Sequence, residues 1–319
     1  MIVVSFFFAD CGKKTESPPE PSAAEESASE SGAEPGPEGD EGDETPGAIT
    51  VEEKIVYENE GLVITLKGFV EGEEGRLSSW PKIQFLVENG TPEHLKIRTT
   101  ESSVNGVMVN SYMKCEVGPG ERADAEMGLF TTDLKRANIE KIIDVDFIFH
   151  FIGETSATDY RYSDVVSIRI AADNSYMQTY DDSGVLLVDQ GGIKIVNQGL
   201  SYENDISDRD LSLYIENNSN DNVRVRVKSC YVNGVLIEFY TETVVLSGKK
   251  AYTAFTFKKA TLLSNGVEDI ELLEIVFEIS ESRSYALIFD SEEVLIKVDG
   301  VETTLVPNAE ETEEIAAIE

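Results

Sequence analysis

Residue types that do chemistry are sparse in this chain, and their spacing fits no common catalytic site. The 319 residues include two histidines, His94 and His150, which lie far apart in the sequence. A Ser-His-Asp triad or a histidine-based zinc site needs more partners than these, and no G-x-S-x-G turn is present. We therefore predict a protein that is not an enzyme and uses no cofactor.

The segment Ser247-Gly248-Lys249-Lys250 has the end of a phosphate-binding loop but lacks its beginning. That loop requires a glycine five positions before Gly248, and Thr243 stands there instead. The segment is predicted to be a turn between two strands.

Three aspartates, Asp205, Asp208 and Asp210, lie close together in a predicted loop. Carboxylate oxygens on loops are ligands that Ca²⁺ accepts. The spacing does not match a known calcium loop, so a metal site is one hypothesis and solvated turn residues are the other.

The only tryptophan, Trp80, precedes Pro81 at the end of a predicted loop. An exposed aromatic side chain on a β-sandwich can stack on a sugar or anchor a protein partner. The sequence leaves two roles open for Trp80, ligand binding and packing at the edge of the sandwich.

The charge of the chain excludes one class of partner. Acidic residues number 61 against 26 basic ones, and the formal net charge is -35. Polyphosphate backbones would repel such a molecule, so nucleic acid is not an expected partner.

Of the three cysteines, Cys115 and Cys230 fall at positions that do not correspond between the two halves of the chain, which favours buried free thiols over a disulfide framework.

The third cysteine, Cys11, follows the apolar run Ile2 to Ala9. Residues 1–11 resemble a bacterial lipoprotein signal, in which the cysteine becomes the lipid-modified first residue of the mature protein. The resemblance implies a lipid anchor at Cys11 on the extracytoplasmic face of the cytoplasmic membrane. Secretion after cleavage is one alternative, and a start of the chain without targeting meaning is another.

Residues 12–49 are rich in Glu, Pro, Ser and Gly and have almost no apolar side chain. Such a segment cannot bury enough surface to offset the entropy of ordering, so we predict a disordered, extended linker. After an anchor, it would hold the following domains away from the membrane. An inert tail is the alternative.

The remainder of the chain is a duplication. Residues 87–170 align without a gap on residues 215–298, so that Asn105-Gly106 falls on Asn233-Gly234. Both Asn-Gly pairs lie between runs of alternating apolar and polar residues, the pattern of a tight β-hairpin. We predict a first domain at 50–171, a linker at 172–184, a second domain at 185–300 and an acidic tail at 301–319.

Each copy is predicted to be an antiparallel β-sandwich of seven or eight strands, with one or two helical turns at Leu134 to Ile142 and at Leu262 to Ile270. The chain is therefore predicted to be all-β. The motif series VENGT, VNGV and SDVVSIRI, with IENNS, VNGV and DSEEVLIKV in the second copy, resembles the immunoglobulin-like domain of Gram-positive lipoproteins, the DUF4352 type. That resemblance implies a fold and transfers no catalytic residue.

These observations favour a non-catalytic binding or scaffold lipoprotein, with a protein or a polysaccharide as its ligand. An enzyme or enzyme subunit with an acidic site built from loops, for example one acting on carbohydrate, is the alternative. A purely structural spacer is the third hypothesis.

Overall fold

The computed structural model describes residues 48–49, 51–72, 80–153, 160–171, 175–202, 208–238, 240–298 and 303–305. They all belong to one compact unit, which holds two separate hydrophobic cores, one in each copy of the repeat. The predicted signal at 1–11 and most of the predicted linker at 12–49 lie outside the described residues.

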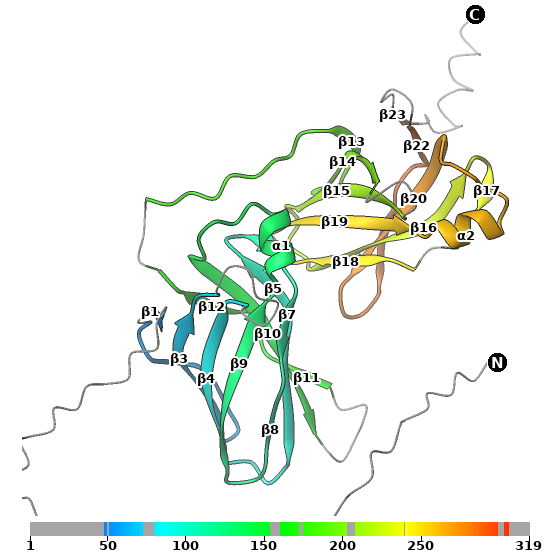
Figure 1. Cartoon of the computed structure of the whole chain (residues 1–319). Helices are drawn as coiled ribbons and strands as arrows, with labels where there is room; N and C mark the ends of the chain where they lie inside the picture. Colours follow the sequence, from blue (N-terminus) through cyan, green and yellow to red (C-terminus); the bar gives the residue numbers. More distant parts are fainter. Residues whose placement is uncertain are drawn as a thin grey trace, which may run out of the picture. The chain divides into compact units, whose positions relative to one another are not determined.

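The first copy is a sandwich of two antiparallel sheets. Its elements are β1 (Ala48–Ile49), β2 (Lys54–Asn59), β3 (Leu62–Val70), β4 (Lys82–Asn89), β5 (Leu95–Val104), β6 (Val107–Met108), β7 (Ser111–Met113), β8 (Cys115–Val117), β9 (Arg122–Leu129), α1 (Thr131–Arg136), β10 (Asp144–Gly153), β11 (Tyr160–Tyr162) and β12 (Val166–Arg169). One layer has the order β1-β3-β4-β9-β7, with β2 paired to β3. The other has the order β11-β10-β5-β6, with β8 on β5 and β12 on β10 (Figure 1).

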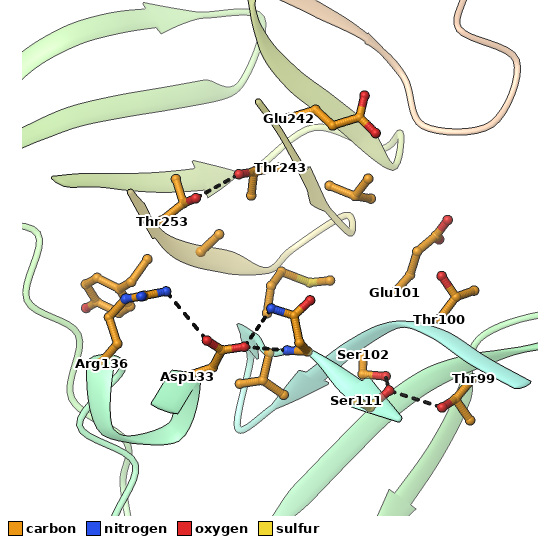
Figure 2. Close-up of a pocket in the computed structure, with 16 residues that line it drawn as sticks. Thr99, Thr100, Glu101, Ser102, Ser111, Asp133, Arg136, Glu242, Thr243 and Thr253 are labelled. Carbon is orange, nitrogen blue, oxygen red and sulfur yellow. Dashed lines mark hydrogen bonds and ion pairs between the residues drawn. The ribbon is translucent and has the colours of Figure 1, made fainter. Parts of the chain in front are cut away.

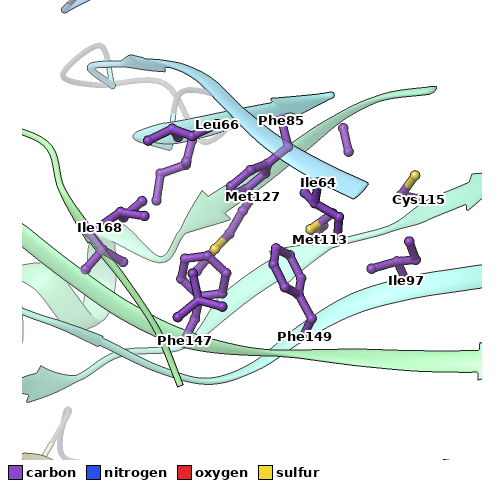
Figure 3. Close-up of a cluster of buried hydrophobic side chains, with 14 of the residues drawn as sticks. Ile64, Leu66, Phe85, Ile97, Met113, Cys115, Met127, Phe147, Phe149 and Ile168 are labelled. Carbon is purple, nitrogen blue, oxygen red and sulfur yellow. The ribbon is translucent and has the colours of Figure 1, made fainter. Parts of the chain in front are cut away.

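The core of the first copy forms because alternate side chains of each strand face the opposite layer. On β4, Phe85 is 1% exposed, and its ring lies 5.8 Å from the rings of both Phe147 and Phe149 on β10. Figure 3 shows these three aromatic rings beside Met113 and Met127 in the same cluster. Burying one such aromatic side chain contributes roughly 1.5–3 kcal/mol.

The second copy repeats this arrangement. Its elements are β13 (Val185–Gln190), β14 (Ile193–Tyr202), β15 (Arg209–Asn217), β16 (Val223–Val232), β17 (Val235–Leu236), β18 (Glu242–Val245), β19 (Lys250–Phe257), α2 (Lys259–Ser264), β20 (Leu272–Glu281), β21 (Leu287–Asp290), β22 (Val294–Lys297) and β23 (Thr303–Leu305). One layer has the order β13-β14-β15-β19, and the other has the order β17-β16-β20-β22-β23.

The register of the strands follows the duplication. Val104 pairs with Val145 in the first copy, and their counterparts Val232 and Leu273 pair in the second. The predicted hairpins are confirmed, since β5 pairs with β6 and β16 with β17 across the two Asn-Gly turns. The all-β sandwich predicted from the sequence is therefore the fold of both copies.

Both helices are shorter and begin earlier than predicted. Each helix ends shortly before a residue with positive φ. This residue is Asn138 at +49° in the first copy and Gly266 at +78° in the second. After α1, the amide of Ile139 donates to the carbonyl of Leu134 at 2.8 Å, the closing bond of a helix that ends in a left-handed residue. The apolar spacing beyond that residue reflects packing against the core, not continued helix.

Strands also extend beyond the predicted domain limits. Ala48 and Ile49 form β1 on the edge of β3, although the linker was predicted to run to residue 49. Thr303–Leu305 form β23 against β22, inside the predicted tail. In both places the backbone groups complete the edge of a sheet, a contribution that composition does not reveal.

Candidate functional site

A cavity of about 380 Å³ lies where the two copies meet. We call it the interdomain cavity; its walls are Thr99, Thr100, Glu101, Ser102, Met108, Val109, Asn110, Ser111, Asp133 and Arg136 from the first copy and Glu242, Thr243, Val244, Ala251, Tyr252 and Thr253 from the second. In the first copy β5 and α1 carry part of this wall, and in the second copy β18 and β19 carry it. Figure 2 shows both walls facing the same space.

Hydroxyl groups are the commonest polar groups on the walls of the interdomain cavity, on seven of its sixteen lining residues. On the first copy, the Ser111 hydroxyl lies 2.7 Å from that of Ser102 and 3.1 Å from that of Thr99. On the second copy, Thr243 and Thr253 share a hydrogen bond of 2.9 Å (Figure 2). Each hydroxyl both donates and accepts, so these pairs leave free lone pairs for a further donor.

Each carboxylate of the cavity has an arginine beside it. Asp133 lies 3.5 Å from Arg136 and also accepts two hydrogen bonds from Asn110, each of 2.8 Å. Glu242 forms an ion pair with Arg224. Glu101 lies 3.9 Å from Arg283. The charges around the cavity therefore nearly cancel.

Glu101 has a strained backbone and an unsatisfied side chain. Its φ is +50°, a region that costs a residue with a side chain roughly 1–2 kcal/mol. It lies in an irregular stretch of β5, where pairing to β10 shifts between Asp146 and Ile148. Its Oε2 atom is buried and has no hydrogen-bond partner among the described residues, and burial raises the pKa of this carboxyl group. The corresponding residue of the second copy is Ser229.

Several contacts join the parts of the chain around the cavity. The strands β6 and β19 meet in a parallel pairing between the two copies, Val107 with Lys250. Next to it, Lys249 donates to the Asp146 carboxylate at 2.5 Å. The Tyr180 hydroxyl, in the segment predicted as a linker, donates to the Asn105 carbonyl at 2.9 Å.

Trp80 lies away from the interdomain cavity. Its ring centroid is 4.5 Å from that of Phe130, and a side chain at Gly128 would come within 2.8 Å of the indole. The indole thus covers β9 at a glycine, which is a packing role within the first copy.

Asp208 and Asp210 are used by the second copy itself. Asp208 accepts from the Lys258 ammonium at 2.7 Å and from the Lys259 amide at 2.9 Å, and Asp210 accepts from Thr256 at 2.5 Å. Asp205 lies outside the described residues. Within the described ranges no group of three or more His, Cys, Asp or Glu side chains is placed to hold a metal ion.

Cys115 and Cys230 are buried free thiols in different cores, as the sequence indicated. Burial raises the pKa of Cys230 to about 12, which keeps the thiol protonated and unreactive.

His150 stacks on Tyr162 at 4.6 Å, and burial with nearby Arg98 lowers the pKa of its imidazole. Cys11 lies outside the described residues. No helix in the described part of the chain has the length and apolarity to cross a membrane.

Sequence reasoning missed Glu101 and Lys249. Lys249 was assigned to a turn, and the structure places it on the carboxylate of Asp146 in the other copy. A signal was present in the repeat itself, because Glu101 aligns with Ser229 and Lys249 aligns with Glu121. Positions where duplicated domains differ in charge are candidates for a role that only one copy has.

No protein-family model matches the chain, and no curated protein matches it. A solved structure of a protein of unknown function from Porphyromonas gingivalis W83 is 11% identical with a TM-score of 0.20, over 69% of this chain and 92% of that chain. The Bacteroides uniformis β-glucuronidase 2, covalently bound to cyclophellitol-6-carboxylate aziridine, is 10% identical with a TM-score of 0.22, over 69% of this chain and 26% of that chain. The chain therefore spans about a quarter of that enzyme's length, and at such TM-scores neither likeness bears on function.

Proposed function

We propose that this chain is a surface-tethered, non-catalytic binding lipoprotein. Binding is supported by one observation above the others, the interdomain cavity whose walls come from both copies and present paired hydroxyl groups. Tethering rests on the apolar run that ends at Cys11 and on the acidic segment that follows it. In this proposal the lipid anchors the chain to the extracytoplasmic face of a bacterial cytoplasmic membrane, and the sandwiches carry the ligand site.

Mass spectrometry of the native N-terminus tests the tether. We expect a diacylglyceryl-modified Cys11 as the first residue, and we expect Cys11→Ser to move the protein from the membrane fraction to the medium or to leave it unprocessed. Cys115→Ser is the matched control, because this thiol is buried in the first core and its loss does not affect processing. An unmodified Cys11 in a chain that keeps residues 1–10 would contradict the proposal.

Catalysis on carbohydrate is the alternative function. Glu101 and Glu242 line the same cavity, and glycoside hydrolysis generally uses two carboxyl groups. Incubation of the chain with oligosaccharides followed by chromatography separates the two functions, since a binding protein returns them unchanged. Release of shorter products, lost in Glu101→Gln, would favour the enzyme.

A further inference from the structure

The interdomain cavity is close to neutral in charge. Its three carboxylates, Asp133, Glu242 and Glu101, each lie beside an arginine. An anionic ligand would meet these carboxylates, and a cationic ligand would compete with the arginines. The rest of the lining combines seven hydroxyl-bearing side chains with the apolar side chains of Met108, Val109, Val244 and Ala251, so the walls fit a ligand without net charge that itself carries many hydroxyls.

Glu101 supplies what such a ligand needs, a strong acceptor. Hydrogen bonds from a hydroxyl to a carboxylate are about twice as strong as those between neutral groups. Glu101 lines the cavity, and its buried Oε2 atom lies 3.9 Å from Arg283, so a ligand in the cavity would donate to the other carboxylate oxygen. Figure 2 shows the Glu101 side chain at the same end of the cavity as Glu242 and away from Asp133.

The repeat indicates that Glu101 is not required by the fold. The second copy forms the same strand with Ser229 at this position, in a sheet of the same register. Its corresponding groove, of about 490 Å³, is lined by residues such as Val227, Lys228 and Leu236 and has no wall from another copy. Among the described residues, the groove at the corresponding place in the second copy therefore lacks the second wall that the interdomain cavity has.

We propose that the interdomain cavity binds one neutral saccharide of one or two sugar units, with Glu101 accepting hydrogen bonds from its hydroxyl groups. This inference rests on the proposed binding function and names its ligand class. The volume of about 380 Å³ lies in the lower part of the range for small-ligand sites, about 300–1,000 Å³. Side chains from β5 of the first copy and from β18 and β19 of the second surround the sugar, so binding needs both copies.

Calorimetric titration of the full chain with a panel of neutral sugars tests the proposal. The panel contains glucose, galactose, mannose, N-acetylglucosamine and their disaccharides, each up to about 10 mM, which covers millimolar affinity. We expect at least one to bind with a stoichiometry of one per chain. Glu101→Gln is expected to weaken that binding about tenfold, and Thr253→Val about three- to tenfold.

Matched variants separate a site effect from a folding effect. Glu60→Gln is the control for Glu101→Gln, because Glu60 also has a φ of +50° in the first copy but is exposed and does not line the cavity. Thr65→Val, on β3, is the control for Thr253→Val. Both controls are expected to bind like the parent chain, and circular dichroism melting verifies that all four variants fold.

Four results would overturn the proposal. They are the absence of heat with every sugar, a stoichiometry of two, binding unchanged in Glu101→Gln, and tighter binding of a charged probe such as lysine or inorganic phosphate. None of these results depends on the state of Cys11. A lipidated N-terminus with no sugar binding would therefore reject the saccharide ligand, and the proposed lipid tether would stand. An unmodified Cys11 with one bound sugar would do the reverse.

Discussion

At the scale of single residues, Asn105 and Asn233 show how one side chain closes a hairpin and fixes the strand beside it. The Asn105 side chain donates to the Lys141 carbonyl at 2.6 Å and accepts from the amides of Ile143 and Asp144 at 2.9 and 3.1 Å. Asn233 makes the equivalent three bonds in the second copy, between 2.8 and 2.9 Å. Both asparagines have positive φ, at +49° and +51°.

Replacing either asparagine by alanine should therefore destabilise its own copy to a similar degree. Asn105→Ala and Asn233→Ala each lose these hydrogen bonds and put alanine, which tolerates the left-handed region less well than asparagine, at a positive φ, which together costs about 2–4 kcal/mol. Denaturant titration measures the loss in free energy of unfolding. Asn138→Ala is the control for backbone conformation alone, with an expected cost of about 1 kcal/mol. A small effect at Asn233 beside a large one at Asn105 would show that the copies are not equivalent.

At the scale of elements, β10 of the first copy and the β18–β19 turn of the second are joined through Asp146. This carboxylate accepts from Lys249 at 2.5 Å, from Ser167 at 2.5 Å and from Ser103 at 3.2 Å. Burial raises the pKa of Asp146, but the hydrogen bonds from Lys249 and Ser167 outweigh it, so the pKa lies below its usual value. A lowered carboxyl pKa stabilises the folded state above the unfolded pKa of about 3.9 and loses that contribution as the pH falls through the folded value.

A double-mutant cycle with Asp146→Asn and Lys249→Met measures this link. We expect a coupling energy of about 1 kcal/mol at neutral pH, because both side chains are more than three-quarters buried, at 12% and 24% exposure. The coupling should be lost as the pH falls through the folded pKa of Asp146, which lies below the ordinary aspartate value, because the carboxylate is then protonated. The pair Arg226 and Glu278, whose arginine is 51% exposed, lies within the second copy and serves as the comparison, since breaking it leaves the contact between copies intact. A coupling energy that stays constant as the pH is lowered through the acid range would refute the assignment.

At the scale of the whole molecule, the three cysteines report on both folding and anchoring. Cys115 and Cys230 lie in separate cores at 4% and 1% exposure, and burial raises the pKa of each thiol. Neither is placed to react while its sandwich is folded.

Thiol titration with Ellman's reagent follows from this arrangement. The native mature protein should show no reactive thiol from either core, and the denatured protein should show two if Cys11 carries lipid. A third thiol after denaturation would mean that Cys11 is free. Cys230→Ala removes one of the two and identifies the core from which it came. A fast reaction of the native chain would contradict the burial of these cysteines.

Much of the fold follows from local properties of the sequence. The alternation of Val223, Val225 and Val227 with basic residues assigns a strand with one buried face, because side chains on a strand point to opposite sides in turn. The Asn-Gly pairs assign hairpins, because these two residues tolerate the positive φ that the turn requires. The duplication then transfers each assignment from one copy to the other, and all of these predictions are confirmed.

The interdomain cavity was decided by the tertiary structure alone. Lys249 reaches Asp146 across 103 positions of the chain, and no periodicity or turn signal encodes such a contact. Glu101 is one of 61 acidic residues in the sequence, and only the fold shows that its Oε2 atom is buried, its backbone is strained and it lies beside the second copy. The reason is physical: strand period and turn geometry depend on neighbouring residues, whereas burial and charge pairing between copies depend on which surfaces meet.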